Sequence, residues 1–190
     1  MKILITGVHG FVGSNLVKAL SQEHEIFGLD IIAPLKDGVK FTFGWKHLDS
    51  KDIPDVDAVI HLAGKAHDTK NQSAAETYFK VNTELTKKIF DWYLAHSTAK
   101  KFIQFSTVKS AADRVEGNYL TEECVPTPVG PYGESKIAAE NYIIEKFAPE
   151  ACKQPIRTSE YTQSKWMVLQ PRKPRKILQR IKTPPKYQSV

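Results

Sequence analysis

The sequence has few cysteines and no long apolar segment. Its 190 residues include two cysteines, Cys124 and Cys152, which lack the spacing of metal ligands and are too few for a disulfide framework. No apolar run approaches the ~20 residues that a membrane-spanning helix needs. The first residues, MKILITGVHGF, lack the long apolar region and cleavage site of a signal peptide. We therefore expect a cytoplasmic protein without a metal site and without a membrane partner.

Glycine is missing from the last part of the chain, and the charge changes at the same place. Residues 1–150 contain all ten glycines and carry 17 Lys and Arg against 20 Asp and Glu, a net charge of −3. Residues 151–190 carry 10 Lys and Arg and one acid, a net charge of +9. The formal charge of +6 does not indicate a nucleic-acid partner, because no aromatic-interleaved groove or recognition motif accompanies the basic residues.

Residues 1–149 alternate short apolar runs with longer segments of helical periodicity, which is typical of a parallel sheet with crossover helices. We expect one domain here, an α/β fold with a doubly wound parallel sheet and helices on both faces. The predicted strands are residues 2–6, 25–30, 39–43, 57–62 and 101–106, and the predicted helices are 11–20, 73–95 and 132–147, with a loop over 113–131. In the last helix, the residues expected to face the core are Ile137, Ala138, Tyr142, Ile143 and Phe147.

Three glycines follow the first predicted strand at a spacing that suits a dinucleotide phosphate site. Gly7, Gly10 and Gly13 lie between strand 2–6 and the body of helix 11–20. Gly7 would allow a tight turn, Gly10 would let the backbone approach a pyrophosphate at the helix N-terminus, and Gly13 would let helix and strand pack closely. The spacing is G-x-x-G-x-x-G rather than G-x-G-x-x-G, so an ordinary glycine-bearing strand-to-helix turn is the alternative.

Asp30 favours the dinucleotide interpretation. It ends the second predicted strand, 17 residues after Gly13, where a carboxylate can accept hydrogen bonds from the hydroxyls of an adenosine ribose. A carboxylate there repels a 2′-phosphate, and Ile31 and Ile32 follow it instead of an arginine. The sequence therefore predicts NAD rather than NADP, with a surface acid at a strand end as the alternative.

Tyr132 and Lys136 are spaced to share one face of a helix. A cation beside a phenol favours the phenolate, which makes a tyrosine usable as an acid or base, and the same lysine can hydrogen-bond a ribose. The preceding strand ends in Ser106 and Thr107, at the edge where open α/β sheets bind ligands. His61, inside the fourth strand, is interpreted as a packing residue. This context favours the Tyr132 pair over two pairs of equal spacing, Tyr142 with Lys146 and Tyr161 with Lys165.

The chain resembles the extended short-chain dehydrogenase/reductase family, specifically its NAD-dependent epimerase/dehydratase branch, which acts on nucleotide sugars. The resemblance covers residues 1–149 and implies a Rossmann-like fold. It implies Tyr132 as the catalytic acid/base, Lys136 as its charged, ribose-binding partner, and Thr107 as the hydroxyl that orients the substrate. It rests on TGVHGFVGS, a strand-end Asp, DVDAVIHLAG, Asn82, FIQFST and PYGESK, in the family's order. The cofactor contacts that it implies are Gly7, Gly10, Phe11, Val12, Gly13, Asp30, Leu62, Ala63, Gly64, Ser106, Tyr132 and Lys136.

The resemblance implies an NAD-dependent nucleotide-sugar epimerase, similar to a UDP-hexose 4-epimerase, that transiently oxidises its UDP-linked substrate to a 4-keto sugar. Val108 and Lys109 follow Thr107, where family dehydratases have Asp-Glu, so 4,6-dehydration is not expected. A 4-keto-sugar reductase and an NAD-binding module with little or no turnover stay open as alternatives. A homodimer through helices 73–95 and 132–147 is implied by the resemblance alone.

Residues 150–190 depart from the family pattern. Family members carry a small substrate domain after the Tyr-Lys helix, whereas this segment is basic, interrupted by proline, and compatible with one short strand at 166–169. We expect an irregular tail, an aberrant or truncated remainder of the substrate domain such as a frameshift would leave. A genuine basic tail that binds nucleic acid or anionic lipid is the alternative.

Overall fold

Six strands form one sheet in the order β3-β2-β1-β4-β5-β6 in the computed structural model of this chain. The residues that the structure describes are 1–66, 74–95, 99, 101–114, 120 and 124–147, together with the backbone of 166–169. Five strands are parallel: β1 (Lys2–Thr6), β2 (Glu25–Leu29), β3 (Phe41–Phe43), β4 (Ala58–His61) and β5 (Lys101–Phe105). Their order is that of a doubly wound sheet, so the predicted fold class is confirmed.

β6 (Trp166–Leu169) changes the edge of this sheet. It pairs antiparallel with β5, so the sheet is not parallel throughout. The sequence predicted only that this segment could form a strand, because the direction of pairing depends on a connection whose path cannot be seen in the local pattern. The rest of the tail, like Ser73 at the start of the second predicted helix, lies outside the described residues.

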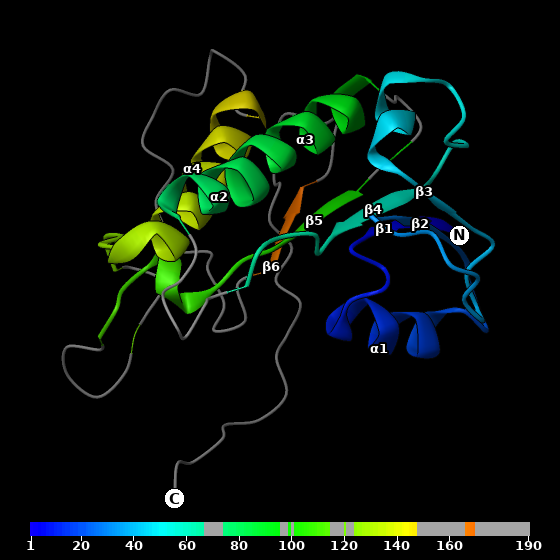
Figure 1. Ribbon diagram of the computed structural model, residues 1–190, viewed down its shortest axis with the longest axis horizontal. Helices are drawn as coiled ribbons and strands as arrows, with labels where there is room; N and C mark the ends of the chain where they lie inside the picture. The colour runs from blue at the N-terminus through cyan, green and yellow to red at the C-terminus, as the bar shows by residue number, and fades with distance from the viewer. Residues whose placement is uncertain are drawn as a thin grey trace, which may run out of the picture.

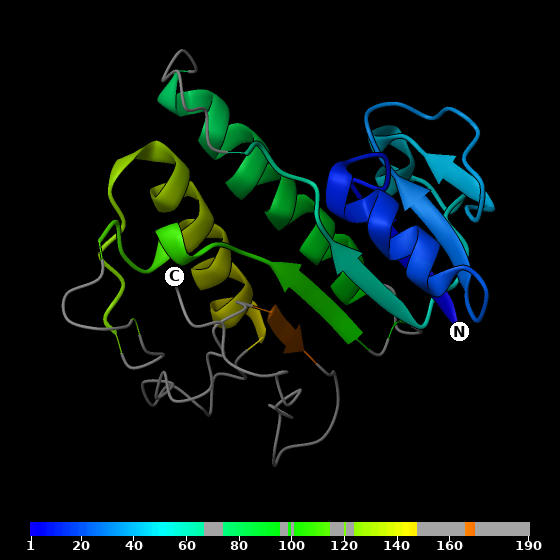
Figure 2. The ribbon, with the colours of Figure 1, turned by 90° about the horizontal axis from the view of Figure 1, so that it is seen from below.

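Helices cover both faces of the sheet, as predicted. α1 (Phe11–Leu20) lies on one face, whereas α2 (Ala75–Tyr78), α3 (Leu85–Ala95) and α4 (Gly130–Phe147) lie on the other (Figures 1 and 2). Between α2 and α3, Phe79–Glu84 forms a π-helical segment, η2. Two short 3₁₀ helices, η1 (Trp45–Asp49) and η3 (Val108–Ser110), follow β3 and β5.

Two apolar cores result from the alternation of side chains along the strands. In β1, Ile3 and Ile5 point to the α1 face, whereas Leu4 points to the α3 and α4 face. Burial on both faces explains why the strands are continuous apolar runs in the sequence. The first core contains Ile3, Ile5, Val8, Val17, Ile26 and Ile60. The second is larger and includes Leu4, Phe27, Leu29, Val59, Ile89, Phe90, Tyr93, Phe102 and Ile143.

The start of α4 and part of its buried face differ from prediction. The helix begins at Gly130 rather than Tyr132: Gly130, with a left-handed φ of +79°, turns the chain into the helix, and Pro131 suits the first helical turn. Ile143 lies in the core and Tyr142 and Phe147 pack against it, as expected, whereas Ile137 and Ala138 are only half-buried. Other residues of α4 are buried instead, where polar partners on neighbouring elements contact them. The buried residues of α4 are Gly133, Ser135, Lys136, Ala139, Glu140 and Ile143.

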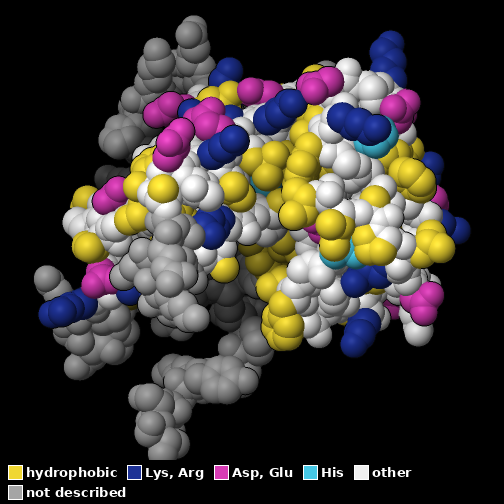
Figure 3. Space-filling model, in the orientation of Figure 1, with side chains coloured by type: hydrophobic (Ala, Val, Ile, Leu, Met, Phe, Trp, Pro, Cys, Tyr) yellow, Lys and Arg dark blue, Asp and Glu magenta, His cyan; other side chains and the backbone are white. Residues whose placement is uncertain are grey.

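The described surface carries acidic and basic side chains side by side, without one large basic patch on the face shown in Figure 3. Lys87 pairs with Glu84 at 2.8 Å and Lys88 pairs with Asp49 at 3.0 Å. Exposed pairs of this kind contribute little to stability. Within the described part of the chain, no helix has the length and apolar character to cross a bilayer, and no group of three or more His, Cys, Asp or Glu could hold a metal ion.

Candidate active site

The glycine loop after β1 is packed so tightly that a side chain would not fit at Gly13 and would be strained at Gly7. Gly7 has a left-handed φ of +70°, and its amide donates to the Leu29 carbonyl at 2.8 Å. A Cβ on Gly13 would lie 2.5 Å from the Gly7 carbonyl oxygen, and a Cβ on Gly7 would lie 3.0 Å from the Ala63 backbone. The glycines thus bring the N-terminus of α1 against the ends of β1 and β4, a cradle that fits a dinucleotide pyrophosphate. Phe11 and Val12 are exposed beside it.

Asp30 lies directly against this loop. Its carboxylate accepts the His9 amide on Oδ2 at 3.0 Å and the Ile31 amide on Oδ1 at 2.7 Å. The side chain is buried and therefore held in one orientation by backbone donors. Each carboxylate oxygen retains capacity for a further hydrogen bond, so Asp30 is placed to accept ribose hydroxyls from a nucleotide on the loop.

The segment after β4 joins the cofactor loop to α4. The amides of Leu62 and Ala63 both donate to the Thr6 hydroxyl, at 3.2 and 3.1 Å. A Cβ on Gly64 would lie 3.3 Å from Lys136 Nζ, so this glycine allows the lysine to approach the end of the strand. The structure therefore brings Gly7, Ala63, Gly64 and Lys136 to one edge of the sheet.

Lys136 is a buried cation at this edge. Its side chain comes from α4, is 8% exposed, and donates from Nζ to the Phe105 carbonyl at 3.3 Å. Burial lowers the pKa of the Lys136 ammonium below its usual value, and the nearby Glu140 carboxylate opposes that effect. Tyr132, one turn earlier, is half-buried with its ring edge-on to Tyr78, the centroids 6.1 Å apart.

Ser106 and Thr107 follow β5 next to the carbonyl that Lys136 contacts. The Ser106 hydroxyl donates to Glu140 Oε1. Thr107 caps η3, and its Oγ1 accepts the Lys109 amide at 3.3 Å. Both residues therefore end at the carboxyl edge of the sheet with Lys136, as the sequence predicted, while the roles assigned to them remain predictions.

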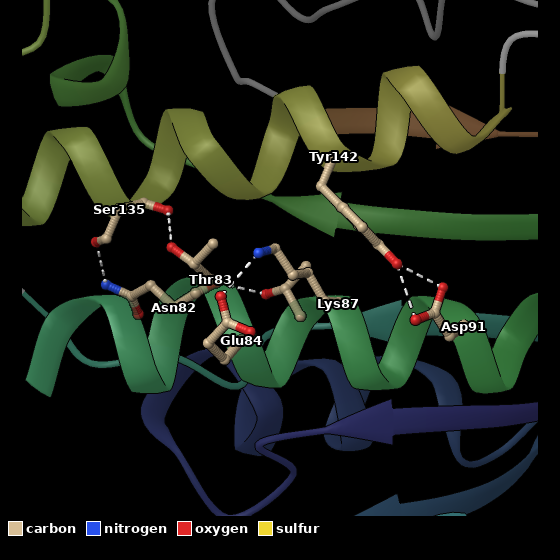
Figure 4. Close-up of polar contacts among 8 residues, drawn as sticks. Asn82, Thr83, Glu84, Lys87, Asp91, Ser135 and Tyr142 are labelled. Atoms are coloured by element: carbon tan, nitrogen blue, oxygen red, sulfur yellow. Dashed lines mark hydrogen bonds and ion pairs between the residues drawn. The ribbon is translucent and has the colours of Figure 1, made fainter. Parts of the chain in front are cut away.

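Polar contacts fix α4 against η2 (Figure 4). Asn82 donates from Nδ2 to Ser135 Oγ at 3.0 Å, and the Thr83 hydroxyl donates to the Ser135 carbonyl at 2.8 Å. Asn82 also accepts the Lys65 amide on Oδ1 at 2.7 Å, and Ser135 donates from its hydroxyl to the Tyr132 carbonyl at 2.9 Å. The first turn of α4, which carries Tyr132, is thereby tied to the segment after β4.

Several of these buried polar residues were not identified from the sequence. Ser135 and Glu140 lie on a helix whose apolar pattern suggested another face, and Thr86 lies on a helix read for its apolar stripe. One usable signal was spacing: Thr86 follows Asn82, and Glu140 follows Lys136, each by four residues on one helical face.

His61 links β1 to η2 through a hydrogen-bond chain of fixed polarity. The Thr86 hydroxyl donates to the Asn82 carbonyl at 2.6 Å, so it accepts from His61 Nε2 at 2.8 Å. His61 Nδ1 then accepts from the Thr6 hydroxyl at 2.6 Å. Burial, aided by the charge of Lys136, lowers the pKa of His61 to about 3. His61 is thus a neutral packing residue, as expected.

This neutral histidine predicts an acid-sensitive fold. Because its pKa falls from 6.5 to about 3 on folding, the unfolded chain binds a proton in this range that the folded chain does not, and stability decreases as pH falls through it. Between pH 7 and pH 5 we expect His61 to remove on the order of 2 kcal/mol from the free energy of unfolding. Urea denaturation of the wild type and of His61→Asn at both pH values measures this. An equal loss in the variant would contradict the assignment.

Comparison with known proteins agrees with this geometry. Residues 3–148 match the model of the NAD-dependent epimerase/dehydratase family. A UDP-glucose 4-epimerase of Vibrio cholerae is 30% identical over 155 residues, covering 75% of this chain and 46% of that protein. One from Streptococcus mutans is 28% identical over 153 residues, covering 74% and 45%.

Solved structures share the fold. The UDP-glucuronic acid 4-epimerase from Bacillus cereus, in complex with NAD, superimposes with a TM-score of 0.60 at 26% identity, covering 76% of this chain and 52% of that chain. This chain spans about half the length of the relatives it matches. With the family model matched over most of its residues, the chain belongs to the NAD-dependent epimerase/dehydratase family.

Proposed function

We propose that residues 1–149 are the NAD-binding part of a nucleotide-sugar 4-epimerase that acts on a UDP-linked hexose. The observation that carries the proposal is the meeting of the glycine loop, Gly64 and Lys136 at one sheet edge, with Tyr132 one helical turn from the lysine. Relatives named as UDP-glucose 4-epimerases support the choice of sugar nucleotide.

The cofactor site is formed by groups that the fold holds rigidly. The loop from Gly7 to Gly13 and the N-terminus of α1 would hold the pyrophosphate, and Asp30 would accept the adenosine-ribose hydroxyls. Lys136 would donate to the second ribose. Bound NAD supplies reversible hydride transfer, a chemistry that amino-acid side chains cannot provide.

Proton transfer would fall to Tyr132. Acting as a phenolate, it would accept the proton of the sugar hydroxyl while that carbon is oxidised, and it would return the proton after the keto sugar has turned. Thr107 would orient the same hydroxyl. The two redox half-steps cancel, so the reaction needs no added reductant.

The cofactor choice can be tested by calorimetric titration with NAD and NADP. We expect NAD to bind at least about tenfold more tightly, since the fixed Asp30 carboxylate repels a 2′-phosphate. Asp30→Asn keeps the shape but removes the charge, so it should narrow this difference. Failure to bind NAD would contradict the proposal.

The reaction is tested on the same protein with UDP-glucose or UDP-galactose and NAD. Interconversion without reduced cofactor supports the epimerase. Reduction of a 4-keto sugar that requires added NADH would identify a reductase, and NAD binding without either reaction would identify a binding module. Each of these last two results would overturn the epimerase assignment.

A further inference from the structure

Glu140 is a buried acid to which the proposed reaction assigns no role. It lies on α4 one turn after Lys136 and is 2% exposed. Its Oε1 accepts from the Ser106 hydroxyl and lies 2.7 Å from the Ser110 hydroxyl oxygen. A carboxylate buried to this extent is costly unless it is hydrogen-bonded or paired with a charge. The two serine hydroxyls supply hydrogen bonds to it but no charge.

Lys136 is the buried cation on the same helical face. The Phe105 carbonyl accepts a hydrogen bond from its Nζ but carries no charge. Among the titratable groups around it, His61 on β4 is neutral near pH 7, because burial lowers its pKa to about 3. Lys65, after β4, directs its ammonium to the Tyr78 ring, 5.3 Å from the centroid, and as a cation cannot compensate another. Tyr132 lies one turn earlier on α4.

We propose that Glu140 is a positioning residue whose carboxylate, held by Ser106 and Ser110, is the counter-charge that keeps the buried Lys136 ammonium protonated. Residues four apart on a helix are neighbours, and a pair at low solvent exposure interacts more strongly than one in water. The effect of Glu140 on catalysis rests on the proposed function, because it acts through the charge of Lys136, which that function places beside the reacting groups.

The same carboxylate connects α4 to the segment that carries Thr107. The Ser110 hydroxyl lies 2.7 Å from both the Thr107 carbonyl oxygen and Glu140 Oε1, so its proton can be shared between them. The residue that balances the charge of Lys136 therefore also fixes the turn after β5. A test must separate the charge of Glu140 from its hydrogen bonds.

Glu140→Gln makes that separation, since the amide oxygen can still accept while the charge is lost. We expect the Lys136 ammonium to titrate about one pH unit or more lower in this variant. The titration is followed by NMR of ¹³C-labelled lysine side chains, with the Lys136 signal assigned by its absence in Lys136→Arg. Ser110→Ala is the matched control, which removes a hydrogen bond but no charge and should leave the Lys136 titration unchanged.

Two results would overturn the proposal: a native-like Glu140→Gln with the wild-type Lys136 titration, or an equal shift in Ser110→Ala. If Glu140→Gln does not fold, Glu140→Asp is used in its place, because its shorter side chain moves the carboxylate away from Lys136 by one methylene. A folded Glu140→Asp in which Lys136 titrates as in the wild type would also overturn the proposal. The readout needs neither NAD nor substrate, so it is independent of the proposed function.

If the epimerase assay succeeds, Glu140→Gln should lower kcat near pH 7 more than tenfold without a matching rise in KM. Glu140→Asp should restore part of the lost kcat. A wild-type kcat and a wild-type pH profile in Glu140→Gln would overturn the catalytic part of the proposal.

Discussion

Gly13→Ala is expected to reduce NAD affinity on the order of a hundredfold and to destabilise the fold by about 1–3 kcal/mol. The added Cβ would lie 2.5 Å from the Gly7 carbonyl oxygen and 2.8 Å from Val8 Cα. Both are backbone atoms, so the clash can be relieved only if α1 moves away from the glycine loop. Calorimetric titration with NAD and urea denaturation measure the two effects.

Gly44→Ala is the control for this substitution. Gly44 has an extended backbone, and the nearest atom to an added Cβ would be His47 Nδ1 at 3.9 Å. We expect NAD affinity to be unchanged and stability to change by less than about 1 kcal/mol. Wild-type NAD binding by a folded Gly13→Ala would show that the glycine loop is not the pyrophosphate site.

Tyr132→Phe is expected to lower kcat of the proposed epimerase by a factor on the order of a hundred to ten thousand, the usual contribution of one acid/base group. NAD affinity and KM should change little, because the phenol is proposed to transfer the proton and not to bind the nucleotide. Interconversion of UDP-hexoses under saturating NAD measures the first effect, and calorimetry measures the second.

Tyr142→Phe matches this change on the same helix. Tyr142 also precedes a lysine by four residues, but its hydroxyl donates to the Asp91 carboxylate at 2.7 Å, and burial and that carboxylate raise the pKa of Tyr142 to about 12 (Figure 4). Its loss should leave kcat unchanged and cost about 1 kcal/mol of stability. Equal losses of activity in the two variants would rule out Tyr132 as the specific acid/base.

Much of the fold could be predicted because both faces of the sheet are covered. Strands buried on both sides are continuous apolar runs, and those at 2–6 and 101–105 were visible within one residue of their limits. The glycine loop and Asp30 were visible for a different reason, since a tight turn and a strand-end carboxylate are local features. Their proximity follows from the parallel pairing of β1 and β2.

The buried polar side of α4 could not be predicted in the same way. Ser135 is buried because Asn82, 53 residues away, donates to it, and Glu140 is buried because Ser106 and Ser110 contact it. Such burial depends on partners brought together by the complete fold. Apolar periodicity alone therefore finds the apolar part of the buried face of such a helix and misses the buried polar part. The antiparallel pairing of β6 depends on long-range contacts in the same way.

The π-helical segment η2 has a consequence for the permitted length of the chain. Its wide turn lets two consecutive residues reach the same partner, Asn82 the side chain of Ser135 and Thr83 its carbonyl. A π turn amounts to one residue more than a regular helix accommodates, and each residue of an α-helix turns the next by about 100°. Deleting one residue here would restore a regular helix but rotate Asn82 relative to the apolar residues of α3. The contacts of Asn82 and of the apolar residues of α3 therefore require the present number of residues between Ala75 and Ala95. A substitution keeps that number, whereas a single deletion does not.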